Sequence, residues 1–373
     1  MRTLVGAETF RRIIQESLLL AILLWIFGCT ASPIPPEVQL TEEQEHRLWI
    51  LGAEVYAPAD FNRYRISFRQ AKEDLIQERS RMVWFQDFQA VQSKFRDVLK
   101  AGYIVQKKIL EQKSRKQETV SNQMSLLKNR VETLKGLTEK INEGRLARKD
   151  LVKAELLLSE AASRYGREDY AAAEDKIRDL PGLIAAAEDV ILPIFSRYAD
   201  RDHINKWRKM ADETMAESRR RDIHAIIVDK SRRLLLLYKN GVPLKTYPVG
   251  LGRNGSLDKS YAGDNSTPEG KYRVIKKISA SRYHRALLID YPNEDDRRDF
   301  IRAKKKGLLP AGARIGGLIE IHGGGQDSMT YGCIAMDNQA IDSLFTLVDV
   351  GTPVTIVGTV DYRNSLSSAI EGS

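Results

Sequence analysis

The chain has 373 residues, of which 42% are hydrophobic and 29% are charged. This length favours two or three domains, and this composition excludes a wholly disordered or collagen-like chain. The formal net charge is +9, and the chain contains only two cysteines, Cys29 and Cys333. Two cysteines cannot form a disulfide framework. The sequence also has no CxxC pair and no set of cysteines and histidines spaced as ligands of a structural zinc ion.

The first 29 residues have the pattern of an export signal. Arginines precede an apolar run over residues 18–27, which would span only about 15 Å as a helix and is too short to cross a membrane. The run is followed by Gly28 and Cys29, which resemble a bacterial lipobox, where the cysteine receives lipid after cleavage. We therefore expect a signal peptide over 1–28, a lipidated Cys29 and a Pro-rich tether over 29–40. The alternative is an ordinary signal or buried helix with an incidental cysteine.

Residues 41–221 have helical periodicity and little strand signal, which predicts an all-α region. Within it, apolar residues alternate at spacings of four and three and form an a/d seam. The seam positions are Val120, Met124, Leu127, Val131, Leu134, Thr138 and Ile141. The seam is typical of a coiled coil that binds a protein partner, and equally of one arm of an antiparallel bundle. We favour the bundle arm.

From residue 222 the pattern changes to short β-like runs, which predict a mostly β domain over 222–360 and a tail over 361–373. The predicted strands are 224–229, 234–238, 242–249, 272–278, 286–289, 318–321 and 354–357, with a helix over 338–348. The expected fold class is therefore α+β and multidomain, with the helical region first.

One histidine and one cysteine of this domain suggest nucleophilic chemistry. His322 ends a predicted strand, and Cys333 follows after a glycine-rich loop. An imidazole can take the proton of a thiol, and backbone N–H groups at Gly332 and Cys333 could face a developing oxyanion. A buried, inert cysteine beside a strand-ending histidine is an equally good interpretation on chemistry alone. His224 and His284 are spaced too irregularly to complete a metal site with this pair, so no metal is expected.

Several separated motifs of the domain occur in the order found in a known family. They are Ile227-Val228-Asp229-Lys230, Val249-Gly250-Leu251-Gly252, Gly263-Asp264, Thr267-Pro268-Glu269-Gly270, His322-Gly323 and Gly332-Cys333-Ile334-Ala335-Met336. Over roughly residues 222–358 the chain resembles the YkuD-type L,D-transpeptidases, and most closely their YafK-like branch.

The resemblance implies roles for individual residues. Cys333 would be the nucleophile that forms a thioester with a peptidoglycan stem peptide, and His322 the general base, oriented by the backbone carbonyl of Gly323. No cofactor is implied, and carbapenems should acylate the cysteine. The residues expected to contact substrate or shape its cleft are Thr330, Tyr331, Gly324, His284 and Asp264.

Two positions depart from the family's pattern. Tyr331 stands where most members have a histidine, and Ala335 stands where many have an arginine. These changes bear on the recognition of the substrate carboxylate and on the choice between amine and water as acceptor. The resemblance implies a transpeptidase that makes 3–3 cross-links or attaches a protein. A hydrolase of the same fold, releasing stem peptides or a bound lipoprotein, and a non-catalytic peptidoglycan-binding scaffold are the alternatives.

The expected partners and location follow from these features. They are peptidoglycan stem peptides, a membrane reached through the lipid on Cys29, and a protein partner if the seam is a coiled coil. With an export signal in front, no nucleic acid is expected. We expect a bacterial envelope lipoprotein facing the periplasm, with Thr30 favouring the outer membrane. Because Cys29 would carry lipid and Cys333 must stay a free thiol, we expect no disulfide between them.

Overall fold

A computed structural model describes residues 34–82 and 85–371 of the chain. The expected signal peptide over 1–28 and the lipidation site at Cys29 lie outside the described residues. The chain divides into two compact units, one of Met1–Asn122 with Tyr165–Ala172 and one of Gln123–Arg164 with Ala173–Ser373. The predicted helical region of 41–221 is therefore shared between the two units.

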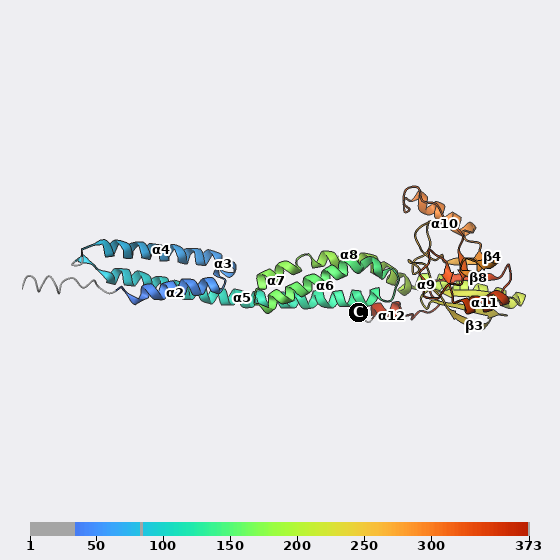
Figure 1. Ribbon diagram of the computed structural model, residues 1–373, viewed down its shortest axis with the longest axis horizontal. Helices are drawn as coiled ribbons and strands as arrows, with labels where there is room; N and C mark the ends of the chain where they lie inside the picture. The colour runs from blue at the N-terminus through green and yellow to red at the C-terminus, as the bar shows by residue number, and fades with distance from the viewer. Residues whose placement is uncertain (1–33, 83–84, 372–373) are drawn as a thin grey trace, which may run out of the picture. The chain divides into compact units, whose positions relative to one another are not determined.

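Helices occupy the described chain up to residue 221 (Figure 1). They are α2 (Pro36–Ile50), α3 (Ala53–Tyr56), α4 (Pro58–Ser80), α5 (Phe88–Thr138), α6 (Gly144–Gly166), α7 (Tyr170–Ile177), α8 (Leu180–Ala199) and α9 (Arg201–Arg221). Helix α2 begins inside the expected tether, because Pro36 fits the first turn of a helix, where its missing N–H is not needed. None of the helices among the described residues combines the length and apolar character needed to cross a membrane.

In the first unit, α2, α4 and the first half of α5 surround a core rich in aromatic residues. The rings of Phe68 and Phe95 meet edge to face, with 6.2 Å between their centroids. The side chain of Gln44 donates a hydrogen bond to the Leu99 carbonyl at 3.0 Å. Gly102 permits this approach, because a Cβ there would lie 2.0 Å from Oε1 of Gln44.

The a/d seam lies on the long helix α5, except for Ile141, which follows the end of that helix. Its residues Val120, Val131 and Leu134 are each at most 1% exposed, so this chain already covers them. This burial agrees with the bundle arm that we favoured, and the coiled-coil partner has no support in the structure.

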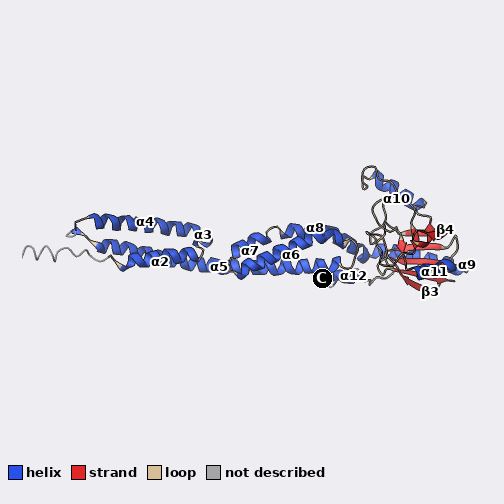
Figure 2. Cartoon of the chain, in the orientation of Figure 1, coloured by secondary structure: helices blue, strands red, loops and turns tan. Residues whose placement is uncertain are grey.

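The second unit contains the sheet domain (red strands in Figure 2). Its strands are β1 (His224–Asp229), β2 (Leu234–Lys239), β3 (Val242–Pro248), β4 (Gly270–Ser281), β5 (His284–Ile289), β6 (Glu320–His322), β7 (Ile334–Ala335) and β8 (Pro353–Val357). They form one sheet in the order β3-β2-β1-β8-β4-β5-β6-β7. The pairs β1–β8 and β6–β7 are parallel and the other pairs are antiparallel. The predicted α+β class is confirmed.

Helices cover the sheet from within the same unit. Helix α11 (Asn338–Leu347) contributes Ile341 and Leu344 to a core cluster that also contains Leu287 of β5 and Ile321 of β6. Helix α9 packs against β8, where Oγ1 of Thr214 lies 2.6 Å from Oγ1 of Thr355. A Cβ at Gly358 would lie 2.4 Å from the ring of Trp207, so only glycine lets α9 pack this closely.

Two elements of this domain were not predicted. Helix α10 (Glu294–Lys305) buries none of its residues, so it has no apolar face to reveal it in the sequence. A capping box between Asn293 and Asp296 starts it instead. Strand β7 has only two residues, too few to show an alternating pattern. It nevertheless follows directly on Cys333 and pairs with β6.

Candidate active site

The pairing of β6 with β7 brings His322 and Cys333 to one face of the sheet. The two strands run parallel, with Ile321 opposite Ile334 and His322 opposite Ala335. Paired residues point to the same face and successive residues alternate, so His322, Ala335 and the preceding Cys333 share a face. Ile321 and Ile334 point the other way, into the core cluster under α11. In this register Cys333 stands opposite Glu320, so His322 is its diagonal neighbour across the strand pair, with about 7–8 Å between such positions.

Two contacts hold the His322 ring. Nδ1 lies 2.6 Å from the carbonyl oxygen of Gly323, an acceptor, so Nδ1 carries the hydrogen and Nε2 is left with a lone pair. The ring of Tyr283 stacks on the imidazole with 4.3 Å between centroids and 20° between planes. His322 is buried, and burial lowers its pKa, which keeps the imidazole neutral near pH 7.

Cys333 is a half-buried, free thiol. Its Sγ lies 3.7 Å from the Leu318 carbonyl, which accepts a weak S–H hydrogen bond. Burial raises the pKa of Cys333, and the negative charge of Glu320 adds to the rise. A hydrogen bond with the Glu320 backbone and the positive charges of Lys259 and Arg282 act against it. The resting thiol and the resting imidazole are therefore both neutral, so thiolate formation needs a proton acceptor at the moment of attack.

The segment from Thr330 to Cys333 is fixed by its own hydrogen bonds. Oγ1 of Thr330 donates to the Cys333 carbonyl at 2.7 Å and accepts from the Gly332 N–H at 3.1 Å. Gly332 has φ +134°, and a Cβ there would lie 2.7 Å from the Ser266 carbonyl oxygen, so glycine is required. The Gly332 N–H, expected to face an oxyanion, is thus already engaged, which leaves the Cys333 N–H as the candidate donor.

The other residues expected at the cleft differ in their exposure and in the contacts that they make. Tyr331 is 68% exposed, and its ring lies 5.3 Å from the guanidinium carbon of Arg253. Gly324 is exposed and donates its N–H to Oδ1 of Asn338 at 2.9 Å. Asp264 is engaged in holding its own loop, where its carboxylate accepts from Lys259 Nζ at 2.7 Å and from neighbouring backbone N–H groups.

His284, at the start of β5, contacts helix α11. Its Nε2 lies 2.8 Å from Oδ1 of Asp342, on helix α11. The side chain that stacks on His322 is Tyr283, one position earlier in the β4–β5 turn. Within residues 34–82 and 85–371, no three His, Cys, Asp or Glu side chains are grouped so that they could hold a metal ion.

Sequence reasoning missed a buried ionic network beside this site. Glu269 is 5% exposed at its side chain and accepts from Lys230 Nζ at 2.8 Å, from Arg197 at 2.9 Å and from Trp207 Nε1 at 2.9 Å. Arg197 and Trp207 belong to α8 and α9, on the far side of the predicted boundary at residue 222. The sequence analysis included Glu269 only as part of the Thr267-Pro268-Glu269-Gly270 motif. Nothing in the sequence predicted which residues would bond to its carboxylate.

The sheet domain matches a known family of catalytic domains. Residues 223–356 match the family model YkuD, the L,D-transpeptidase catalytic domain. YafK of Escherichia coli strain K12, to which an L,D-transpeptidase activity is provisionally assigned, is 32% identical over 150 residues, which cover 38% of this chain and 54% of YafK. YafK of strain O157:H7 matches equally. The chain thus spans about half the length of the curated relatives it matches.

Solved structures of L,D-transpeptidases also resemble this chain. The enzyme from Xylanimonas cellulosilytica is 16% identical, with 36% of this chain and 60% of that chain covered and a TM-score of 0.25. L,D-transpeptidase 3 from Mycobacterium tuberculosis is 15% identical, with the same coverage and TM-score. The family match over 223–356 confirms the resemblance drawn from the motifs of the sheet domain.

Proposed function

We propose that the sheet domain is a peptidoglycan-modifying L,D-transpeptidase with Cys333 as nucleophile and His322 as general base. One observation carries this proposal: the pairing of β6 with β7 puts His322 and Cys333, which directly precedes β7, on one face of the sheet, inside the residues that match the catalytic-domain family. The Nδ1 contact to Gly323 supports the role of the base, because it directs the free lone pair of Nε2 away from that carbonyl.

The reaction then proceeds in two half-reactions. Nε2 of His322 takes the thiol proton while Sγ of Cys333 attacks the carbonyl between the diamino acid and the terminal D-alanine of a stem peptide. The N–H of Cys333 donates to the oxyanion. His322 returns the proton to the departing D-alanine amine, and a thioester remains. An amine of a second stem peptide or of a protein then displaces the thiol, which recovers its proton through His322.

Intact-mass spectrometry of the full chain after incubation with a carbapenem tests the nucleophile. We expect a covalent adduct in the wild type and none in Cys333→Ala. A wild type without an adduct, or an equal adduct in Cys333→Ala, overturns the assignment of the nucleophile.

Defined muropeptides separate the possible products. With an amine acceptor present, a transpeptidase forms a 3–3 linked dimer or an amine conjugate, whereas a hydrolase releases only trimmed stems or a detached lipoprotein. A scaffold that merely binds peptidoglycan gives neither product. Only the first of these outcomes supports the transpeptidase.

We further propose that lipid on Cys29 holds the protein at the envelope membrane, facing the periplasm and favouring the outer membrane. The support is the sequence pattern before and after Cys29, together with a domain family that acts on peptidoglycan. Metabolic labelling with a fatty-acid analogue tests it, since Cys29→Ser should lose both label and membrane retention. A labelled Cys29→Ser protein contradicts the anchor.

A further inference from the structure

The turn between α5 and α6 contacts the sheet domain within the second unit. Nδ2 of Asn142 donates to the Gly252 carbonyl at 3.1 Å. The two terminal nitrogens of Arg145 donate to the Arg253 carbonyl and to Oδ1 of Asn254, each at 2.9 Å. The helical turn therefore binds backbone and side-chain acceptors on three successive residues of one loop.

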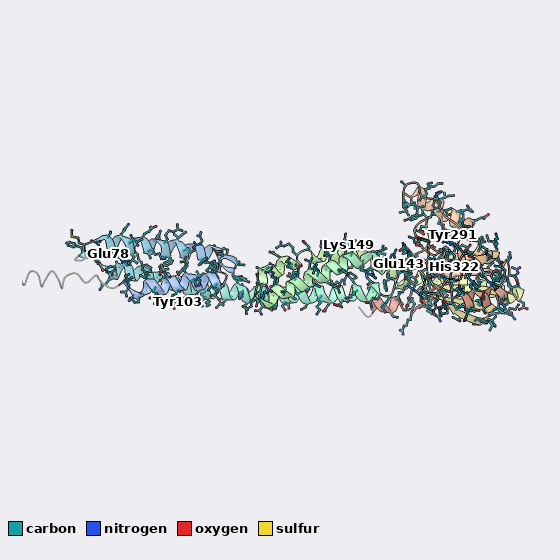
Figure 3. The ribbon with its side chains drawn as sticks, viewed as in Figure 1. Glu78, Tyr103, Glu143, Lys149, Tyr291 and His322 are labelled. Atoms are coloured by element: carbon teal, nitrogen blue, oxygen red, sulfur yellow. The ribbon has the colours of Figure 1, made fainter. Side chains whose placement is uncertain are left out.

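A buried carboxylate reinforces this contact. Glu143 is fully buried, and its Oε1 accepts the Ser256 N–H at 2.8 Å. Gly144 allows the tight turn, because a Cβ there would lie 2.0 Å from the Thr138 carbonyl oxygen. Figure 3 shows Glu143 at the end of the helical hairpin nearest the sheet domain that contains His322. The four contacts bind four of the five residues of the segment 252–256, which we call the clamp loop.

The clamp loop in turn holds the nucleophile segment. The Arg253 N–H donates to the Thr330 carbonyl at 2.9 Å, and the Thr330 N–H donates to the Leu251 carbonyl at 3.0 Å. A Cβ at Gly252 would lie 3.2 Å from Cα of Gly332, so the two glycine backbones are in close contact. Thr330 then bonds the Cys333 carbonyl through its hydroxyl. A continuous chain of hydrogen bonds connects Arg145 to Cys333.

We propose that Arg145, with Asn142 and Glu143, positions the Cys333 nucleophile through the clamp loop, so that the α5–α6 hairpin is a working part of the active site. Arg145 is a positioning residue, since it touches neither the thiol nor the imidazole. The inference rests on the proposed function for its catalytic consequence, whereas the coupling of the turn to residues 330–333 stands independently. A catalytic group displaced by about 1 Å can lose on the order of a hundredfold in rate.

The test compares Arg145→Ala with Lys149→Ala in the full chain. Lys149 is exposed on the same helix, carries the same charge and lies farther along α6 from the sheet domain (Figure 3). We expect Arg145→Ala to slow carbapenem acylation about ten- to a hundredfold and Lys149→Ala to stay within about twofold of wild type. Arg145→Lys should restore only part of the rate, because one ammonium cannot occupy both guanidinium positions.

Two further measurements separate positioning from loss of folding. Iodoacetamide needs only a thiolate, so the pH profile of alkylation on the peptide containing Cys333 should be nearly unchanged in Arg145→Ala. Amide hydrogen exchange should accelerate in residues 252–256 and 330–333 and remain at wild-type rates in β1 and β8. Acylation and exchange equal to those of Lys149→Ala overturn the proposal, as does loss of protection throughout the sheet.

If the proposed function is wrong, the experiments give a result that differs from failure of the positioning proposal. A wild type that no carbapenem acylates refutes the role of Cys333 as nucleophile. The exchange comparison between Arg145→Ala and Lys149→Ala still decides whether the hairpin holds the nucleophile segment.

Discussion

Replacing Glu269 by alanine should destabilise the second unit strongly. The side chain of Lys230 is fully buried and that of Arg197 is 21% exposed, and both donate to the same carboxylate. The charges of these two residues outweigh the effect of burial, so the pKa of Glu269 is lowered. Removing one partner of a buried ion pair costs about 3–5 kcal/mol, because it leaves uncompensated charge in the interior. For a unit of this size we expect a fall in Tm of about 6–20 °C.

Scanning calorimetry of the full chain measures this loss. The matched control is Glu213→Ala on helix α9, which breaks an exposed 2.7 Å pair with Lys271 of strand β4 and should cost no more than about 1 kcal/mol. Because the pKa of Glu269 is lower in the folded state, its contribution is full above the ordinary value of about 4.3 and is lost as the pH falls through the folded value. A Glu269→Ala shift no larger than that of Glu213→Ala would refute the reasoning.

Three further substitutions test the site itself. His322→Ala should slow carbapenem acylation by about 10²–10⁴-fold. It should also abolish the decline in rate that we expect of the wild type at a pH below the ordinary imidazole value of about 6.5, because burial lowers the pKa of His322. A variant with an unchanged rate would exclude His322 as the base. Gly332→Ala should cost about 1–3 kcal/mol and impair acylation, because its φ and the 2.7 Å approach to Ser266 forbid a Cβ. The control Gly136→Ala, in an open helical position, should be neutral or stabilising in thermal unfolding. Tyr283→Ala should slow acylation about three- to tenfold, because it removes the ring stacked on His322. Tyr283→Phe keeps a ring in that place and should retain most of the rate. Equal acylation rates for the two variants would exclude the stacking effect.

Much of the sheet domain could be predicted because its signals are local. The runs at residues 224–229 and 234–238 have the apolar composition of strands, and the Asn240-Gly241 pair marks the turn that follows. The glycines flanking His322 and Cys333 drew attention to the two residues that the sheet brings to one face. Strand β7 escaped prediction because two residues are too few to show a periodic pattern, and helix α10 because it is highly polar and buries none of its residues.

The contacts around the site could not be predicted because they join residues far apart in the chain. Arg145 and Arg253, or Trp207 and Glu269, meet only when helices and sheet pack together. The stacking of Tyr283 on His322 also depends on how β5 pairs with β6, which the sequence around residue 283 does not show. The domain boundary predicted at residue 222 followed the change in periodicity, although α8 and α9 contribute charged and aromatic groups to the interior beyond it.

The central claim is that Cys333 carries the acyl group. The most direct measurement is peptide mass spectrometry after brief incubation of the full chain with a tetrapeptide muropeptide, without an acceptor, followed by acid quenching. The account predicts a thioester on the peptide containing Cys333, with the mass of the muropeptide less D-alanine, and release of free D-alanine. An adduct on another residue, or D-alanine released at the same rate by Cys333→Ala, would contradict it.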